Sequence, residues 1–218
     1  MGLSCSRVLS RVRSLLLLKS VGITAFMTLF FMAYFHLLNH PVRPVVAMPL
    51  TIVDRLVPFL PASLPLYLSL WVYVSLPPSL IVERRELERY GLAIGLVCLT
   101  GLACFLLWPT AVPRTVLDWQ GFPGSDLLQG IDKAGNACPS LHVATAVFSA
   151  VWMHRILGQL VAPRWSKGVN LIWAAAIVLS TLSTRQHVFL DVLAGTALGL
   201  AGAALLLAWQ RRADSAPG

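Results

Sequence analysis

Six long apolar segments, separated by short polar stretches, constrain this chain of 218 residues more than any other feature. A helix needs about 20 mostly apolar residues to cross a bilayer, and six windows are close to that length. They are residues 20–38, 64–82, 90–108, 141–161, 169–182 and 188–209. Hydrophobic residues make up 57% of the chain and charged residues only 12%, which excludes an ordinary soluble domain. We therefore predict an all-α fold, a polytopic bundle of six transmembrane helices.

The second apolar segment is the least regular of the six. It contains Pro65, Pro77 and Pro78. Because a proline inside a helix removes a backbone hydrogen bond, we expect this span to be kinked or re-entrant. The first segment is too long for a signal peptide and no small-residue cleavage site follows it, so we interpret it as a retained helix.

Lysine and arginine residues are unevenly divided between alternate loops. Of the 17, twelve fall on one predicted side of the membrane: Arg7, Arg11, Arg13, Lys19, Arg84, Arg85, Arg89, Arg155, Arg164, Lys167, Arg211 and Arg212. Cytoplasmic loops carry the excess of these residues, so we predict that both termini are cytoplasmic. The net charge of +8 reflects this topology and not nucleic-acid binding, because the basic clusters lack interleaved aromatic residues.

We expect residues 1–218 to form a single integral membrane domain. Residues 1–19 are its basic cytoplasmic N-terminal segment, residues 109–140 an outer loop that carries part of a functional site, and residues 210–218 a cytoplasmic tail. The outer loop is the longest irregular segment, and loops of that length usually have a function. The four cysteines show no evident disulfide pair.

The first candidate motif is Cys138-Pro139-Ser140-Leu141-His142, at the start of the fourth segment. Proline followed by serine is typical of a helix start, where unpaired N–H groups and the helix dipole favour an anion. Ser140 adds a hydroxyl donor. His142, one turn into the helix, would lie close enough to give a proton to a leaving oxygen.

The second candidate motif surrounds His187 and Asp191, at the start of the sixth segment. Four residues apart, the two share a face of a helix. A carboxylate bonded to one imidazole nitrogen fixes the tautomer and makes the other nitrogen a better nucleophile or base. An acid inside a span costs about 2.5–3.5 kcal/mol at the bilayer centre and less near an end, so it normally has a partner, and His187 is available at helical spacing.

Three further assignments depend on these two motifs. The loop alternation puts Ser140, His142, Arg185 and His187 on one non-cytoplasmic face, so the motifs can meet. Arg185 by itself would be interpreted as an interfacial anchor, but beside two histidines phosphate binding is the better interpretation, because a guanidinium matches phosphate oxygens bidentately. His142, His187 and Asp191 could also hold a metal ion, but their spacing matches no familiar metal motif, so we predict no metal and no cofactor.

These residues resemble a known family. Pro139-Ser140-Leu141-His142 and the spacing His187-x-x-x-Asp191 are similar to the second and third signature motifs of the type 2 phosphatidic acid phosphatase and haloperoxidase superfamily. The resemblance implies that His187 attacks phosphorus to form a phosphohistidine and that Asp191 orients it. It also implies that His142 protonates the leaving group and that Ser140 holds a phosphate oxygen. The six-helix layout, with the motifs opening the fourth and sixth spans, is similar too.

The phosphate-binding cations depart from the family pattern. The first family motif is a lysine, six intervening residues and Arg-Pro; Arg114 matches its arginine, but Leu107 stands where the lysine would fall and Thr115 replaces the proline. The third motif usually opens with Ser-Arg, and Thr181 occupies the place of that arginine. We expect Arg185, four residues further along a helix, to replace the missing guanidinium. Whether Lys133 or another cation replaces the missing lysine stays open.

The resemblance therefore implies a metal-independent lipid phosphatase that hydrolyses a lipid phosphate monoester or pyrophosphate. The incomplete cation set also resembles the divergent membrane branch near the inositolphosphorylceramide and sphingomyelin synthases, which makes a phospholipid headgroup phosphotransferase the alternative. A catalytically silent transporter subunit or scaffold is a second alternative. The expected partners are a lipid phosphate substrate and the bilayer, with no nucleic acid and an unknown oligomeric state. The expected location is the bacterial inner membrane, with the site facing the periplasm.

Overall fold

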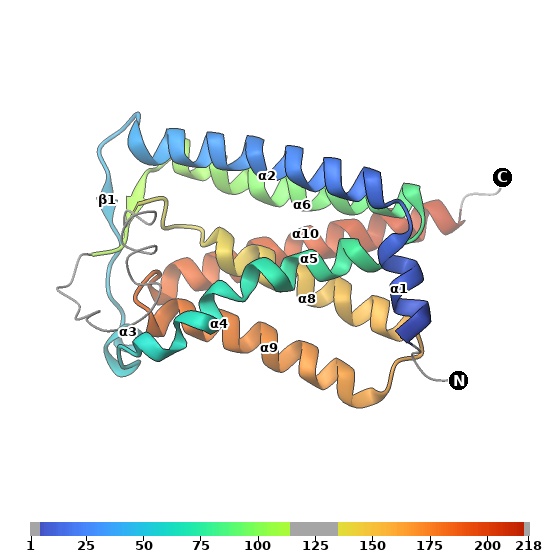
Figure 1. Cartoon of the computed structure of the whole chain (residues 1–218). Coiled ribbons are helices and arrows are strands. Elements are labelled where there is room, and N and C mark those ends of the chain that lie inside the picture. Colours follow the sequence, from blue (N-terminus) through green and yellow to red (C-terminus); the bar gives the residue numbers. More distant parts are fainter. Residues whose placement is uncertain (1–4, 114–134, 216–218) are drawn as a thin grey trace.

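The computed structural model describes residues 5–113 and 135–215, and this part of the chain is mostly helical. In chain order the helices and strands are α1 (Cys5–Arg13), α2 (Leu16–Asn39), β1 (Val46–Ala47), α3 (Ile52–Leu56), the 3-10 helix η1 (Pro61–Ser63), α4 (Leu64–Leu68), α5 (Leu70–Leu80), α6 (Arg84–Leu107), β2 (Thr110–Ala111), α8 (Leu141–Gln159), α9 (Arg164–Ser183) and α10 (Phe189–Ser215). The long helices lie side by side as one bundle (Figure 1).

Four of the helices, α2, α6, α9 and α10, are long and apolar enough to cross a membrane. Their outward side chains are large and apolar: Leu29 on α2 is 67% exposed, Leu99 on α6 is 64% exposed and Ile172 on α9 is 71% exposed. So much contiguous apolar surface is matched by lipid and not by water. The chain is therefore an integral membrane protein, as its composition predicts.

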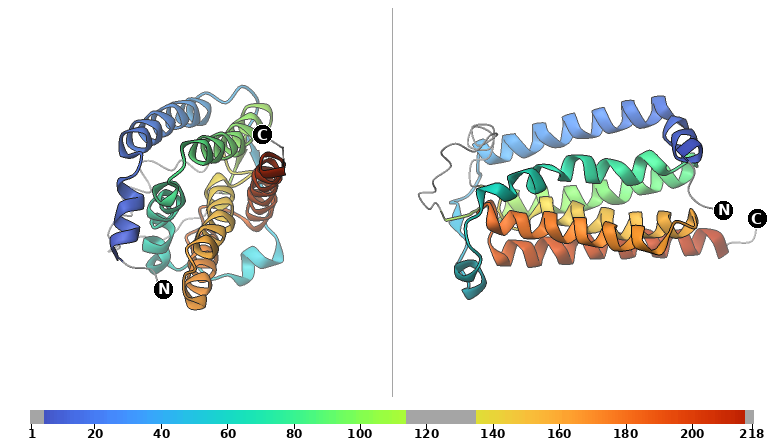
Figure 2. Two further views of the ribbon diagram at one scale, coloured as in Figure 1. Left: turned by 90° about the vertical axis from the view of Figure 1, so that its right-hand side faces the viewer. Right: turned by 60° about the horizontal axis from the view of Figure 1, so that its bottom comes forward.

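The other two predicted spans also fold as helices along the bundle. The fourth span is α8, which packs against α5, α6, α9 and α10 and lies between them in the end-on view (Figure 2, left). It is not among the four helices apolar enough to be candidate spans, and its central position allows this. Inside a membrane bundle a helix contacts protein and not lipid, so small and weakly polar residues such as Ala144, Ala146 and Ser149 are buried along it.

The second predicted span is divided into α4 and α5, and the interruption lies at Ser69 and not at the paired prolines. The Ser69 hydroxyl donates a hydrogen bond to the Leu66 carbonyl oxygen (2.6 Å) and accepts one from Trp173 Nε1 on α9 (2.9 Å). Pro77 and Pro78 lie close to the C-terminus of α5, where few hydrogen bonds remain to be lost.

Helix ends differ from the predicted apolar windows. Helix α6 begins at Arg84, six residues before its window, α9 begins at Arg164, and α10 continues to Ser215. Hydropathy detects only the part of a helix that lies in hydrocarbon. The backbone hydrogen bonds continue into the polar flanks until a stop such as Pro163, which precedes α9.

The two helices that follow the candidate motifs pack through small residues. A Cβ atom added to Gly195 of α10 would collide with the carbonyl oxygen of Ser140, and one added to Gly199 would collide with that of Ala144. Glycines four residues apart lie on one helix face and let two backbones approach closely in a membrane. This contact between α8 and α10 fixes the distance between the two motifs.

The two ends of the bundle differ in structure. Helix α1 and the C-terminal part of α10 lie at one end, whereas α3 and β1 lie at the other (Figure 1). At that second end β1 and β2 form a short parallel pair, with Val46 opposite Thr110 and Ala47 opposite Ala111. The segments just before α8 and α10 are also at this end, so the structure brings the two motifs together as the sequence predicts.

Candidate active site

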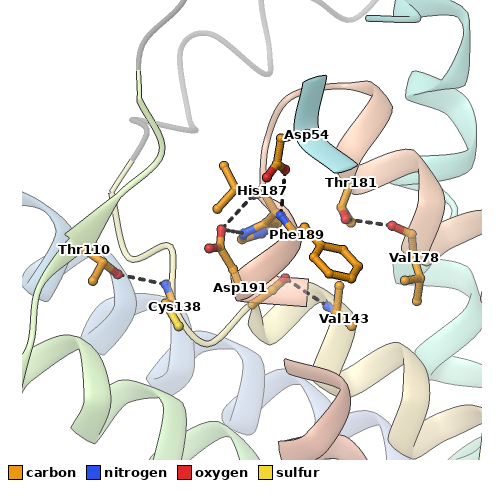
Figure 3. Close-up of polar contacts among 11 residues, drawn as sticks. Asp54, Thr110, Cys138, Val143, Val178, Thr181, His187, Phe189 and Asp191 are labelled. Carbon is orange, nitrogen blue, oxygen red and sulfur yellow. Dashed lines mark hydrogen bonds and ion pairs between the residues drawn. The ribbon is translucent and has the colours of Figure 1, made fainter. Parts of the chain in front are cut away.

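His187 and Asp191 are paired, but not as two residues on one helix. Helix α10 begins at Phe189, so the prediction that His187 lies on the helix is wrong. Asp191 is instead the third residue of the helix, and its Oδ2 accepts a hydrogen bond from the Val188 N–H (2.9 Å), as the acidic member of a capping box does. The same Oδ2 lies 3.2 Å from His187 Nδ1 (Figure 3).

This pairing prepares His187 for chemistry at one nitrogen. The Asp191 side chain is fully buried and that of His187 is 11% exposed, so the carboxylate is held away from competing solvent. When Nδ1 carries the proton and donates it to Asp191, the lone pair of the ring is at Nε2. His187 Nε2 is then the nucleophilic or basic atom of the pair.

Ser140 connects the two motifs directly. It is the N-cap of α8, and its Oγ accepts a hydrogen bond from the Val143 N–H (3.2 Å), which confirms that the helix starts where the sequence predicts. Its own N–H donates to the main-chain oxygen of Asp191 (3.1 Å). The hydroxyl accepts here and still carries a proton, so it can donate to an anion at the helix N-terminus.

His142 is held by the ring and the main chain of Tyr67, with which it also forms a hydrogen bond. Its ring stacks on that of Tyr67 from α4, with centroids 4.0 Å apart and planes at 15°. Its Nε2 atom is buried and has no hydrogen-bond partner among the described residues. A buried nitrogen without a partner is costly unless a ligand or water fills that role, so the site provides an unused proton donor or acceptor.

Both histidines line a single cavity of about 460 Å³. Its polar end also includes Asn136, whose Nδ2 donates to the Tyr34 carbonyl (3.1 Å). The rest of the wall is apolar and largely aromatic, with Phe30 of α2 and Trp71 of α5 as examples. The sequence motifs therefore meet at one end of an apolar chamber inside the bundle.

Arg185 does not project from a helix. Helix α9 ends at Ser183, and Arg185 follows in a left-handed conformation with φ of 57°. The expectation that it continues the helix from Thr181 is therefore wrong. Its guanidinium donates to the carbonyl oxygens of Asp54 and Val57 at the end of α3, the latter at 2.7 Å. Two of its five N–H donors are thus used.

Asp54 is a site component that the motifs did not indicate. Its carboxylate is almost completely buried. Oδ2 accepts hydrogen bonds from the N–H and hydroxyl of Thr51, both at 2.7 Å, and Oδ1 accepts one from the N–H of Phe189, also at 2.7 Å. Asp54 thus caps α3 and also the first turn of α10, next to His187 (Figure 3). The one local signal for it was the capping-box pattern Thr51-x-x-Asp54.

The part of the chain that carries this site matches a known family. The family model described as the PAP2 superfamily matches residues 105–215, just over half of the chain, and includes both motifs. The chain belongs to the PAP2 superfamily. This confirms the resemblance inferred from the motifs. PAP2 proteins are generally phosphoric ester hydrolases, and the match supports a phosphatase or phosphotransferase function in general. No curated protein and no solved structure matches the chain.

Other parts of the predicted PAP2 site are only partly described. Arg114 and Lys133 lie outside the described residues. Cys138, next to the second motif, is a thiol in this environment, because burial, together with the nearby Asp191 carboxylate, raises its pKa to about 11. A protonated thiol is a poor nucleophile, so His187 is the better candidate. Within residues 5–113 and 135–215, no three His, Cys, Asp or Glu side chains form a metal-binding group.

Proposed function

We propose that this PAP2 protein is a membrane-embedded lipid phosphatase that hydrolyses a phosphate monoester or pyrophosphate through a phosphohistidine. One observation carries the proposal. An Asp191-paired His187 and a partnerless His142 nitrogen line the polar end of the same apolar cavity. Such a cavity accommodates a hydrocarbon chain, and the two histidines provide a nucleophile and a proton donor where the phosphate would lie.

The reaction has two steps with balanced proton transfers. In the first, His187 Nε2 attacks the terminal phosphorus, the bond from phosphorus to the leaving oxygen breaks, and His142 gives its proton to that oxygen, which belongs to the lipid alcohol of a monoester or to the lipid monophosphate released from a pyrophosphate. In the second, water attacks the phosphohistidine, His142 takes a proton from the water, and phosphate leaves as the bond to Nε2 breaks. Asp191 holds the imidazole in one tautomer and stabilises the positive charge that develops on it.

Phosphate binding is assigned to the groups around the histidines. The Ser140 hydroxyl and the N-terminus of α8 provide donors and a favourable dipole. We assign Arg114 to the phosphate as well, on the family motif alone. Arg185 keeps three donors beyond the two bound to α3 carbonyls, so it can contact phosphate and hold the loop at the same time.

The topology proposal places the site in the periplasm of a bacterial inner membrane. Support comes from the position of the basic residues. Arg7, Arg11 and Arg13 are on α1, at the end of the bundle opposite α3 and β1 (Figure 1). The leaflet facing the cytoplasm attracts such clusters, which puts both termini in the cytoplasm and the histidines on the outer side.

The test is phosphate release by the purified full-length protein, with chelator present, from phosphatidate, a prenyl pyrophosphate and phosphatidylglycerol phosphate. We expect release from at least one lipid, its loss in His187→Ala, and its persistence in His154→Ala, the matched histidine elsewhere on α8. Acid-labile phosphate bound to the protein would identify the phosphohistidine. Release that survives His187→Ala, or no release from any lipid, would contradict the proposal. Transfer to ceramide, diacylglycerol or inositol in place of release would favour the headgroup transferase.

A further inference from the structure

The apolar part of the cavity extends about one leaflet deep. Along α2 its wall runs from Phe35, near the end of the helix at the site, to Phe26. At 1.5 Å per residue these nine steps cover about 14 Å. The hydrocarbon core of a bilayer is about 30 Å thick, so the cavity matches the depth of one leaflet. A lipid whose phosphate lies at the histidines would therefore have a chain directed along this wall.

The cavity has a volume close to that of one hydrocarbon chain. Its volume of about 460 Å³ lies in the lower half of the range of about 300–1,000 Å³ in which proteins hold a single small ligand. Helices α6 and α8 form its inner wall through Ile94 and Leu141. These helices pack on the centre of the bundle, so the inner wall cannot move aside for a second chain without disturbing the core.

The outer side of the cavity includes an aromatic contact between α2 and α5. The rings of Phe31 and Trp71 lie with centroids 5.5 Å apart and planes at 49°, within the range in which aromatic pairs attract. Both residues line the cavity, and Trp71 is 43% exposed, so one part of it contributes to the wall while another part faces lipid. A second chain that entered the cavity between α2 and α5 would have to pass these rings.

We propose that the cavity selects lipid phosphates with one hydrocarbon chain over those with two, and that Phe31 and Trp71 set this preference. The proposal rests on the proposed phosphatase function and names its substrate class: a phosphate or pyrophosphate ester of a single-chain lipid alcohol, such as a prenyl phosphate or a lysophosphatidate. Aromatic walls also suit unsaturated chains, since each double bond presents a π face to the rings.

The experiment compares two substrates that differ in one chain. Purified full-length protein in mixed micelles would hydrolyse oleoyl lysophosphatidate and dioleoyl phosphatidate at equal surface concentration, and kcat/KM would be measured for each. We expect the one-chain lipid to be favoured by about tenfold or more, which corresponds to about 1.4 kcal/mol. Equal values, or a preference for the two-chain lipid, would overturn the proposal.

Variants of the ring pair test the cause of the preference. Trp71→Ala and Phe31→Ala should each raise the relative rate on dioleoyl phosphatidate and bring the ratio to within about threefold. Trp165→Ala is the matched control, because Trp165 is 70% exposed at the start of α9 and is not part of the cavity wall; its ratio should stay that of the wild type. An unchanged ratio in both ring variants would reject the assignment of these residues.

The same assay separates the two proposals. A short water-soluble ester, nitrophenyl phosphate, reports on the histidine chemistry without using the chain cavity. Release from it that depends on His187, with no preference between the lipids, would uphold the phosphatase and reject the one-chain cavity. Loss of release from every substrate would reject both.

Discussion

The two histidines of the site are held by different forces. His187 lies in a turn fixed by hydrogen bonds: Asp191 contacts its ring, Asp54 accepts the Phe189 N–H, and Arg185 binds the carbonyls at the end of α3. His142 lies on α8, stacked on Tyr67, with a nitrogen that has no partner among the described residues. One histidine is anchored by a buried carboxylate, and the other by the stacked ring and the main chain of one tyrosine.

The difference matches the two roles that we propose. A nucleophile must be aimed at phosphorus, and a misplacement of about 1 Å can cost about 10²-fold in rate, so a rigid polar anchor helps. A proton donor must give its proton to one oxygen and take another from water, so a fixed hydrogen-bond partner would compete with both. Stacking holds the ring of His142 while its nitrogen stays available to substrate.

The largest expected effect separates the two histidines by leaving group. On a lipid phosphate, both His187→Ala and His142→Ala should lose about 10²–10⁴-fold in kcat. On nitrophenyl phosphate, whose leaving group needs no proton, His142→Ala should recover most of the rate of the first step, whereas His187→Ala should not. The release of nitrophenol in the first turnover would measure this. Equal recovery in the two variants would show that the histidines do not have different roles.

A smaller effect should follow from removing the polar anchor of the His187 turn. Asp54→Ala leaves the Phe189 N–H without its acceptor, and we expect kcat to fall by about 10²-fold with KM within about threefold. Thr51→Val removes one hydroxyl contact to Asp54 but keeps the bond to Phe189, and it should lose less than about threefold. If the two variants behave alike, Asp54 acts only through the stability of α3.

Changing the α8–α10 contact should affect both histidines together. Gly199→Ala puts a Cβ against the Ala144 carbonyl, and the overpacking should destabilise the protein by about 1–3 kcal/mol. Gly91→Ala on α6 has open space around it, and it should be neutral or slightly stabilising. Thermal unfolding in detergent would measure both. Retained stability in Gly199→Ala would show that the helices can separate without cost.

The smallest expected effect concerns the packing of His142. Tyr67→Leu removes the stacked ring, and because an aromatic pair contributes about 0.5–1.5 kcal/mol, we expect a loss of about two- to tenfold in kcat. Tyr67→Phe keeps the ring and should lose less. The first-turnover release from nitrophenyl phosphate should change little in either variant, since that step does not need His142 as an acid. A uniform loss on both substrates would assign Tyr67 a general structural role.

Much of the fold and part of the site could be predicted because their signals are local. Apolar segments of membrane length, the serine at the start of α8 and the spacing of His187 and Asp191 are all patterns within a few residues of each other. The predicted helix ends were less accurate, because hydropathy indicates which residues lie in lipid and not where the backbone hydrogen bonds of a helix end. The sixth helix begins at Phe189, one residue after the predicted window, so His187 lies in the turn before it and does not share a helix face with Asp191.

The sequence by itself determined that the chain enters a membrane, which family it resembles, and which histidines and acid belong to its motifs. The physical reason is that burial in lipid and helix starts depend on composition and short spacings. Only the tertiary structure decided which groups hold those histidines. Asp54 is hydrogen-bonded to Phe189, which lies 135 residues further along the chain, and to Arg185, which lies 131 residues further along. Such contacts depend on how helices pack, and no short spacing in the chain encodes them.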